Sequence, residues 1–252
     1  MSNSKLVDVT IKSPNHSGKR KASVTRITPH CVVGQISAES IGAIFANKSR
    51  KASSNYGIGK SGEIGLYVDE SNRSWCSSSA YNDNKAITIE CASDLNAPYA
   101  FNDSVYTSLV NLCVDICRRY NKTKLLWFRS LKATNAHALA KNEMLLTVHR
   151  WFSNTACPGD WMYNKMGDLA TAVTNILNAD ATKVFTCPFK VKVNIGNLNI
   201  RAGAGTDTLV KSAITKGVYT IVDVKQGKGS NLGWGKLKSG AGWISLDYVT
   251  ML

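Results

Sequence analysis

The chain has 252 residues, 44% of them hydrophobic and 19% charged, so it is long enough for one large domain or two ordinary ones with buried cores. No window approaches the ~18 apolar residues of a membrane span, and Met1–Lys12 has no apolar stretch after a basic start, so we expect neither membrane insertion nor a signal peptide. The formal charge of +14 favours a polyanionic partner: nucleic acid, anionic lipid or an anionic cell wall. The basic residues are scattered and not interleaved with aromatics, and no nucleic-acid motif is present, so we expect no nucleic-acid partner. The oligomeric state stays open.

The first part of the chain alternates between strand-like and helical patterns. Alternating or continuous apolar runs predict strands at Val24–Cys31, Ser54–Ile58, Ile64–Val68, Ala86–Cys91 and Leu145–His149. Apolar residues at helical spacing predict helices at Ala38–Asn47, with Ser37 as N-cap, at Asp103–Asn121 and at Met162–Leu177. This order predicts an α/β (α+β) domain with a central mixed sheet flanked by helices.

The composition and apolar pattern of the sequence change between residues 179 and 188, where helical patterns are replaced by short apolar runs and many glycines. The predicted strands are Phe189–Val193, Leu198–Ile200, Tyr219–Val224, Gly233–Leu237 and Gly242–Leu246. Turns are predicted at Arg201–Thr206 and Gly227–Gly233. Short strands at this density predict a small all-β barrel, so we expect a first domain at residues 1–180 and a second at residues 181–252.

The cysteines are odd in number and show no Cys-x-x-Cys spacing. Without a signal peptide, reduced thiols are expected. Except for Cys157, we expect small buried core residues at all positions: Cys31, Cys76, Cys91, Cys113, Cys117 and Cys187.

Two of the four histidines end predicted strands, and a cysteine follows the second at a short distance. His30 ends one strand, His149 ends another, and Cys157 comes eight residues later. Two imidazoles and a thiolate can form a three-ligand zinc site with an open fourth position. The spacing alone favours two strand-end histidines and a core thiol over a metal site. His16 and His137 lie in polar segments and are expected to be structural or exposed.

Four separated segments resemble motifs of the zinc-dependent N-acetylmuramoyl-L-alanine amidases, the family that includes phage amidase lysozymes and peptidoglycan recognition proteins. The segments are Ile27–Cys31, Ser53–Ile64, Ala86–Glu90 and His149–Gly159, which stand in the family order within residues 24–177. The sequence looks especially like endolysins of phages that infect Gram-positive, clostridium-like bacteria. The resemblance implies that His30, His149 and Cys157 hold Zn²⁺.

The same resemblance implies the catalytic helpers. Tyr56 would assist the transition state and Glu90 would be a general base, although a core-packing tyrosine and a strand-end carboxylate in a salt bridge remain alternatives. Thr155 stands where some family members have a catalytic lysine, so stabilisation would depend more on zinc, Tyr56 or Thr155. Family members often have a Trp-His pair after the hairpin, whereas this sequence has Trp75-Cys76. Any role that the family's histidine plays at this position is therefore absent here.

The implied reaction is hydrolysis of the amide between N-acetylmuramic acid and L-alanine in peptidoglycan. Zinc can lower the pKa of a bound water to ~7 and polarise a carbonyl oxygen. A non-catalytic peptidoglycan receptor is an alternative, but such relatives commonly lose the metal cysteine, whereas Cys157 is present. A host autolysin with the same activity is also open. As an endolysin, the protein would wait in the host cytoplasm until a partner, such as a holin, releases it to the wall.

The second domain carries a resemblance of its own. Asn197–Thr206, Gly233–Leu237 and Gly242–Val249 resemble the signature of bacterial Src-homology-3-like (SH3-like) wall-binding domains. That resemblance implies binding to the peptide or cross-bridge of the Gram-positive cell wall. From Lys183 onward the chain has ten Lys or Arg and three Asp, which favours an anionic wall. We expect Trp234, Trp243 or both to be mostly buried.

Overall fold

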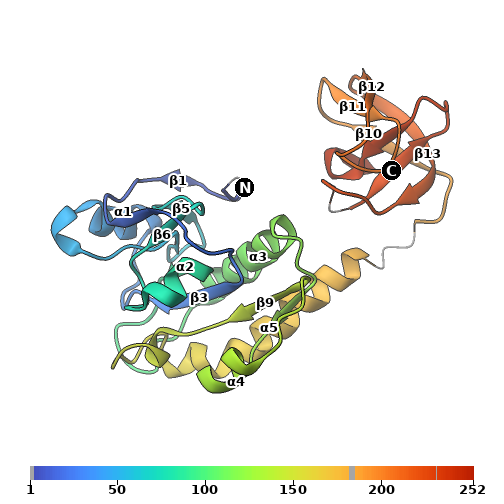
Figure 1. Ribbon diagram of the computed structural model, residues 1–252. Coiled ribbons are helices and arrows are strands. Elements are labelled where there is room, and N and C mark those ends of the chain that lie inside the picture. Colours follow the sequence, from blue (N-terminus) through green and yellow to red (C-terminus); the bar gives the residue numbers. More distant parts are fainter. Residues whose placement is uncertain (1–2, 182–184, 231) are drawn as a thin grey trace. The chain divides into compact units, whose positions relative to one another are not determined.

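The computed structural model describes residues 3–181, 185–230 and 232–252, and the chain divides into two compact units, Met1–Leu177 and Asn178–Leu252 (Figure 1). The domain boundary predicted between residues 180 and 181 adjoins residues 182–184, which lie outside the described residues. In the described part of the chain, no helix combines the length and apolarity that crossing a membrane requires.

The first unit is built on a seven-stranded mixed sheet with the order β1-β5-β4-β7-β3-β9-β8. Its strands are β1 (Val9–Thr10), β3 (Arg26–Cys31), β4 (Tyr56–Ile58), β5 (Ile64–Leu66), β7 (Ala86–Cys91), β8 (Lys124–Leu126) and β9 (Glu143–Leu146). β4 and β5 pair antiparallel, whereas the other neighbours pair parallel. A separate two-stranded sheet joins β2 (His16–Lys19) to β6 (Asn72–Ser74). The mixed sheet with helices confirms the predicted fold class.

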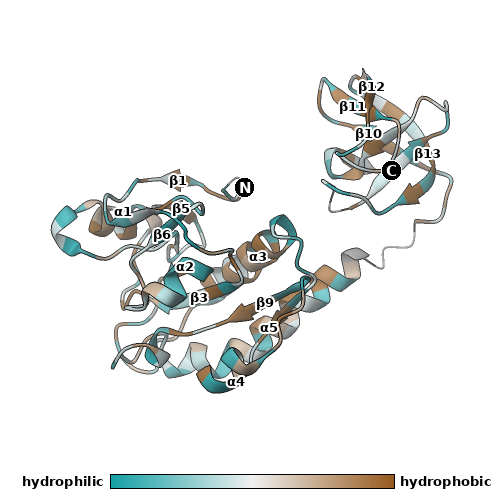
Figure 2. Cartoon of the chain, in the orientation of Figure 1, coloured by the Kyte–Doolittle hydropathy of each residue, from teal (hydrophilic) through white to brown (hydrophobic). Residues whose placement is uncertain are grey.

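Helices pack against this sheet. They are α1 (Ala38–Ala46), α2 (Ala80–Lys85), α3 (Asp103–Arg119), α4 (Leu131–Ala136) and α5 (Asp160–Ala181), with 3-10 turns η1 (Lys48–Arg50) and η2 (His149–Trp151). Ser37 caps α1 as predicted, because its side chain accepts a hydrogen bond from the Ser40 backbone N–H. The main core takes fully buried residues at helical spacing from α3 and α5: Val105, Leu109, Leu112, Ile116, Met162, Met166, Leu169 and Val173. Figure 2 shows these helices and β9 with their apolar residues in brown.

The central strands have one apolar face and one polar face, because successive side chains of a strand point to opposite sides. In β7, Ile87 and Ile89 join the main core, so Thr88 and Glu90 lie on the opposite face. β3 pairs in parallel register with β7, which places His30 directly beside Glu90. Both residues lie near the carboxyl ends of parallel strands, the edge where α/β sheets commonly bind ligands.

The predicted strand Leu145–His149 is wrong at its end. β9 stops at Leu146, and His149 begins η2, a turn closed by the hydrogen bond from the Phe152 N–H to the His149 carbonyl at 2.8 Å. In the first unit, the sequence also did not predict β1, β2, β6, β8, α2 and α4, each of which has six residues or fewer. Elements this short carry too few periods of an apolar pattern to be distinguished.

The second unit is an antiparallel sheet with the order β12-β11-β15-β14-β13-β10-β16 and confirms a separate all-β region. Its elements are β10 (Phe189–Val193), β11 (Leu198–Arg201), β12 (Val210–Ile214), β13 (Gly217–Lys225), β14 (Trp234–Leu237), β15 (Trp243–Ser245), η3 (Leu246–Tyr248) and β16 (Val249–Met251). Trp234 and Trp243 are buried, with 2% and 8% exposure, as predicted. The turn predicted at Gly227–Gly233 includes Asn231, which lies outside the described residues.

All seven cysteines are free. Five are buried, but Cys76 and Cys187 are only partly buried, so the expectation that every cysteine other than Cys157 is a buried core residue is wrong for these two. Cys76 lies on the polar face of the sheet, beside Glu90.

Candidate functional site

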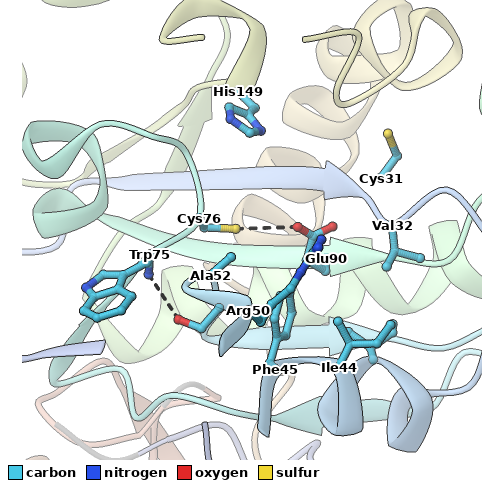
Figure 3. A pocket seen from close by; sticks show the side chains of 12 residues that line it. Cys31, Val32, Ile44, Phe45, Arg50, Ala52, Trp75, Cys76, Glu90 and His149 are labelled. Atoms are coloured by element: carbon cyan, nitrogen blue, oxygen red, sulfur yellow. Dashed lines mark hydrogen bonds between the residues drawn. The ribbon is translucent and has the colours of Figure 1, made fainter. Parts of the chain in front are cut away.

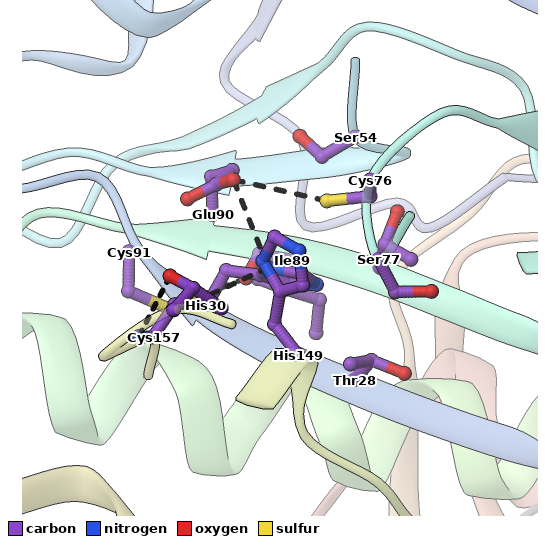
Figure 4. Close-up of polar contacts among 12 residues, drawn as sticks. Thr28, His30, Ser54, Cys76, Ser77, Ile89, Glu90, Cys91, His149 and Cys157 are labelled. Carbon is purple, nitrogen blue, oxygen red and sulfur yellow. Dashed lines mark hydrogen bonds and ion pairs between the residues drawn. The ribbon is translucent and has the colours of Figure 1, made fainter. Parts of the chain in front are cut away.

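Three polar side chains that are far apart in the sequence meet on the polar face of the sheet (Figure 4). His30 comes from β3, His149 from the first residue of η2, and Cys157 from the loop before α5. Their candidate ligand atoms all lie within 4.8 Å of one another. The Cys157 Sγ is 3.3 Å from the His30 Nδ1, and the two imidazole centroids are 5.0 Å apart. The structure therefore brings together the predicted metal-binding residues.

The protonation states of the histidines suit a metal site. Burial, with the neighbouring His149, lowers the pKa of His30 well below its ordinary value. Burial also lowers the pKa of His149. Both imidazoles are therefore neutral near pH 7, which is the form that coordinates metals. The His149 Nε2 is 3.3 Å from the Ser78 Oγ, a contact that orients the ring.

The Cys157 thiol lies in a structured loop. The Cys157 carbonyl accepts a hydrogen bond from the Arg150 N–H at 3.1 Å, and its own N–H donates to the Thr155 Oγ1 at 3.2 Å. The pKa of the Cys157 thiol is raised well above its ordinary value, mainly by a hydrogen bond with Cys31 and secondly by burial. A metal cation bound beside Cys157 would oppose this effect and favour the thiolate.

Glu90 borders the same cluster. Its Oε1 is 3.9 Å from the His30 Nδ1 and 3.7 Å from the Cys76 Sγ, while its Oε2 has no hydrogen-bond partner among the described residues. Burial raises the pKa of Glu90 to about 7, although the Cys76 contact and the Arg50 charge oppose the rise. A carboxyl group with a pKa near the working pH is suited to accepting and returning a proton.

A second donor set shares one residue with the first. His30, Cys76 and Glu90 also place candidate ligand atoms within 4.8 Å of one another. The sequence marked Cys76 only as a departure from the family motif, because its proximity to Glu90 depends on the loop after β6. The thiol thus reaches the site at the position where the motif has an imidazole.

Two adjoining pockets, with volumes of about 200 and 310 Å³, are both lined by His149, and Glu90 lines the smaller one. They share four lining residues: Ala52, Trp75, Cys76 and His149. In the smaller pocket, Ile44 and Phe45 of α1 line one side and His149 lies across from them (Figure 3). Arg50 lines the smaller pocket, and Lys51 and Arg73 line the larger one. The two pockets together, here called the groove, therefore combine an apolar wall, the carboxyl groups of Glu90 and Asp83, and three cations.

Tyr56 does not face the groove, which corrects the expectation that it assists there. Tyr56 pairs with Ile89 rather than with Glu90, so its side chain points to the helix-covered face. It is fully buried, donates a hydrogen bond to the Glu70 Oε1 at 2.5 Å and accepts one from the Ser4 N–H at 2.9 Å. The core-packing alternative describes Tyr56.

The partner of Tyr56 belongs to a buried ion pair that the sequence did not mark. Glu70 has no exposed side-chain surface, and Arg119 of α3 donates two hydrogen bonds to it at 2.6 and 2.7 Å. Such pairs depend on long-range contacts that no local pattern reveals. The contacts tie the hairpin that carries β4 and β5 to α3.

The remaining histidines make structural contacts. His137 is the C-cap residue of α4; its Nε2 lies 2.8 Å from the Glu143 Oε2, and its ring packs against the Phe128 ring. His16 lies in β2, where its Nδ1 accepts a hydrogen bond from the Gly18 N–H.

Comparison with known proteins identifies the first unit. A family described as N-acetylmuramoyl-L-alanine amidase matches residues 20–160. Among solved structures, an endolysin N-acetylmuramoyl-L-alanine amidase from Clostridium intestinale aligns with 18% identity and a TM-score of 0.46, over 66% of this chain and 95% of its own. A mutant endolysin from Bacillus subtilis aligns with 14% identity and a TM-score of 0.45, over 66% of this chain and 99% of its own. No curated protein sequence matches significantly. Because the family match spans more than half of its residues, the chain belongs to the N-acetylmuramoyl-L-alanine amidase family and is a peptidoglycan amidase.

Proposed function

We propose that His30, His149 and Cys157 hold one zinc ion and that this centre hydrolyses the amide between N-acetylmuramic acid and L-alanine. The ligands of a tetrahedral zinc ion lie about 3.3–3.6 Å apart, given Zn–N near 2.0 Å and Zn–S near 2.3 Å. The 3.3 Å between the Cys157 Sγ and the His30 Nδ1 fits that spacing. Two neutral imidazoles and one thiolate also match the donor types that zinc prefers. This convergence is the observation that carries the proposal.

Zinc at this position would supply Lewis-acid chemistry, because it lowers the pKa of water and polarises a carbonyl oxygen. Glu90 is the proposed general base. Its unpartnered Oε2 accepts the proton of the attacking water and returns it to the nitrogen of the leaving L-alanine. Thr155 acts as a positioning residue, because its hydroxyl binds the backbone N–H of Cys157 and orders the loop that carries the thiol.

The groove supports a peptidoglycan strand as the substrate. The two pockets meet at His149, so substrate can extend to both sides of the cluster. Arg50, Lys51 and Arg73 place positive charge along it, which complements the carboxylates of a stem peptide.

We further propose that the second unit is an SH3-like module that binds the Gram-positive wall. Its support is the sequence signature around Arg201, Trp234 and Trp243, together with the excess of basic residues in this part of the chain. With this module the enzyme would be a phage endolysin of a clostridium-like host, held in the host cytoplasm until a holin releases it. A host autolysin is the second origin that fits the same activity.

Analysis of the reaction products tests the activity. Purified wall is digested, and new N-terminal alanine and new reducing sugar are measured. We expect alanine ends without reducing ends; reducing ends would identify a glycosidase. Cys157→Ser should expose no new N-terminal alanine while the protein still binds wall. A protein that binds wall and releases nothing even with zinc would instead be a receptor.

A further inference from the structure

Cys76 and Glu90 form a second pair of potential metal ligands beside the proposed zinc centre (Figure 3). The Cys76 Sγ lies 3.7 Å from the Glu90 Oε1. A sulfur and a carboxylate oxygen bound to one tetrahedral zinc ion lie about 3.5–3.7 Å apart, given Zn–S near 2.3 Å and Zn–O near 2.0–2.2 Å. The two side chains are therefore already spaced as ligands of one ion.

The proposed zinc centre leaves this pair unused, although His30 belongs to both donor sets. The His30 Nδ1 is 3.3 Å from the Cys157 Sγ but 3.9 Å from the Glu90 Oε1. The latter distance is longer than the ~3.3–3.5 Å that separates a nitrogen from an oxygen on one tetrahedral zinc ion. The imidazole therefore fits the first ion better than a second one, and Cys76 and Glu90 remain as ligands that the first ion does not need.

The loop that carries Cys76 is ordered by Asp83 of α2. The Asp83 Oδ2 accepts a hydrogen bond from the Cys76 N–H at 3.0 Å, and the Asp83 Oδ1 accepts from the Ser77 N–H and Oγ at 3.1 and 2.6 Å. Ligands that are fixed in this way lose less conformational entropy when a metal binds. The Glu90 Oε2 has no hydrogen-bond partner among the described residues, so few contacts compete with an ion for the charge of this carboxyl group.

The surroundings of the pair favour weak binding. Both residues line the smaller pocket, which Arg50 also lines, and Lys51 and Arg73 line the larger pocket. A cation therefore approaches against positive charge. The Cys76 thiol must also lose its proton to solvent when an ion binds. Because the pair supplies two protein ligands instead of three, it fits an ion that binds only after the first centre is filled.

We propose that Cys76 and Glu90 bind a second, inhibitory zinc ion when zinc exceeds one equivalent. The inference rests on the proposed zinc centre and adds a regulation of that centre. The second ion would occupy the carboxylate that the reaction needs as its base, so the proton of the attacking water would have no acceptor. Excess zinc therefore lowers the activity reversibly, and a weak chelator that removes only the second ion restores it.

Cobalt(II) can count the thiolates of the full chain, because it binds the same thiolate and imidazole ligands as zinc and each cobalt–thiolate bond absorbs in the near ultraviolet. Titration of the wild type should show a tight step that depends on Cys157 and a weaker step that depends on Cys76. Cys76→Ser should lose only the weaker step. Cys187→Ser is the matched control, because Cys187 is the other partly buried cysteine and lies in the second unit; it should keep both steps.

The amidase rate at increasing zinc gives a second readout. In the wild type, the fraction of activity lost should equal the fraction of the weaker site that is filled. Cys76→Ser, compared with its own activity at one equivalent of zinc, should lose none. A single binding step in the wild type, a weaker step that persists in Cys76→Ser, or a weaker step without loss of activity would overturn the inference. A tight step that persists with its thiolate absorbance in Cys157→Ser would instead reject the proposed zinc centre.

Discussion

Glu90→Gln should change how the stability of the metal-free enzyme depends on pH. The Glu90 side chain is only 15% exposed, and burial raises its pKa from 4.5 to about 7 in the folded state. Because the folded-state pKa lies above the unfolded one, the unfolded chain loses its proton first as the pH rises. The free energy of unfolding therefore falls between pH 4.5 and about pH 7 and then levels off. The full difference corresponds to at most about 3 kcal/mol at 25 °C.

Glutamine has a similar shape and no charge at any pH. We therefore expect Glu90→Gln to match the wild type near pH 4.5 and to be more stable by up to about 3 kcal/mol at pH 8. Hydrogen exchange of the amides in β3 and β7, measured with a chelator present, reports the first unit alone. Asp168→Asn is the control, because Asp168 carries a 70% exposed carboxylate on α5 and should change little. Parallel pH profiles of Glu90→Gln and the wild type would refute the desolvation of this carboxyl group.

Three further substitutions distinguish residues that act at the metal site from residues that stabilise the fold. Tyr56→Phe should keep kcat within about twofold, because the ring lies on the helix-covered face, and cost about 1.5–3 kcal/mol of stability through the lost bond to Glu70; a large loss of kcat would put Tyr56 back at the site. Glu70→Gln should destabilise the first unit by about 3–5 kcal/mol, because it leaves the Arg119 charge without its main partner; denaturation that matches wild type would show that the pair contributes nothing. Thr155→Val should weaken metal affinity about 10- to 100-fold in a chelator competition, because it frees the Cys157 N–H; unchanged affinity would limit Thr155 to loop packing.

The sequence predicted the elements whose signals are local. β7 and β10 have the predicted bounds, and α1 begins at its predicted Ser37 cap, because alternation and capping are read within a few residues. The convergence of His30, His149 and Cys157 was inferred from the family motif, since spacing alone favoured two strand-end histidines and a core thiol.

The wrong predictions concern residues whose position depends on strand register or on loop conformation. Whether Tyr56 faces the groove depends on its pairing with Ile89, and a shift of one residue would reverse its direction. The approach of Cys76 and Arg50 to Glu90 comes from loop and turn segments outside the central sheet, which hydrophobic patterns do not describe. The position of His149 in a 3-10 turn rather than a strand has the same origin, because the turn is closed by two short-range backbone hydrogen bonds that the apolar pattern does not predict.

X-ray absorption at the zinc edge can show whether His30, His149 and Cys157 hold the metal, because it counts the sulfur and nitrogen atoms bound to it. Wild-type protein loaded with one equivalent of zinc should show one sulfur near 2.3 Å and two imidazole nitrogens at about 2.0–2.1 Å. Cys157→Ser should remove the sulfur, whereas Cys76→Ser should leave it in place. A sulfur signal that persists in Cys157→Ser and disappears in Cys76→Ser would place the metal on the other donor set and contradict the account.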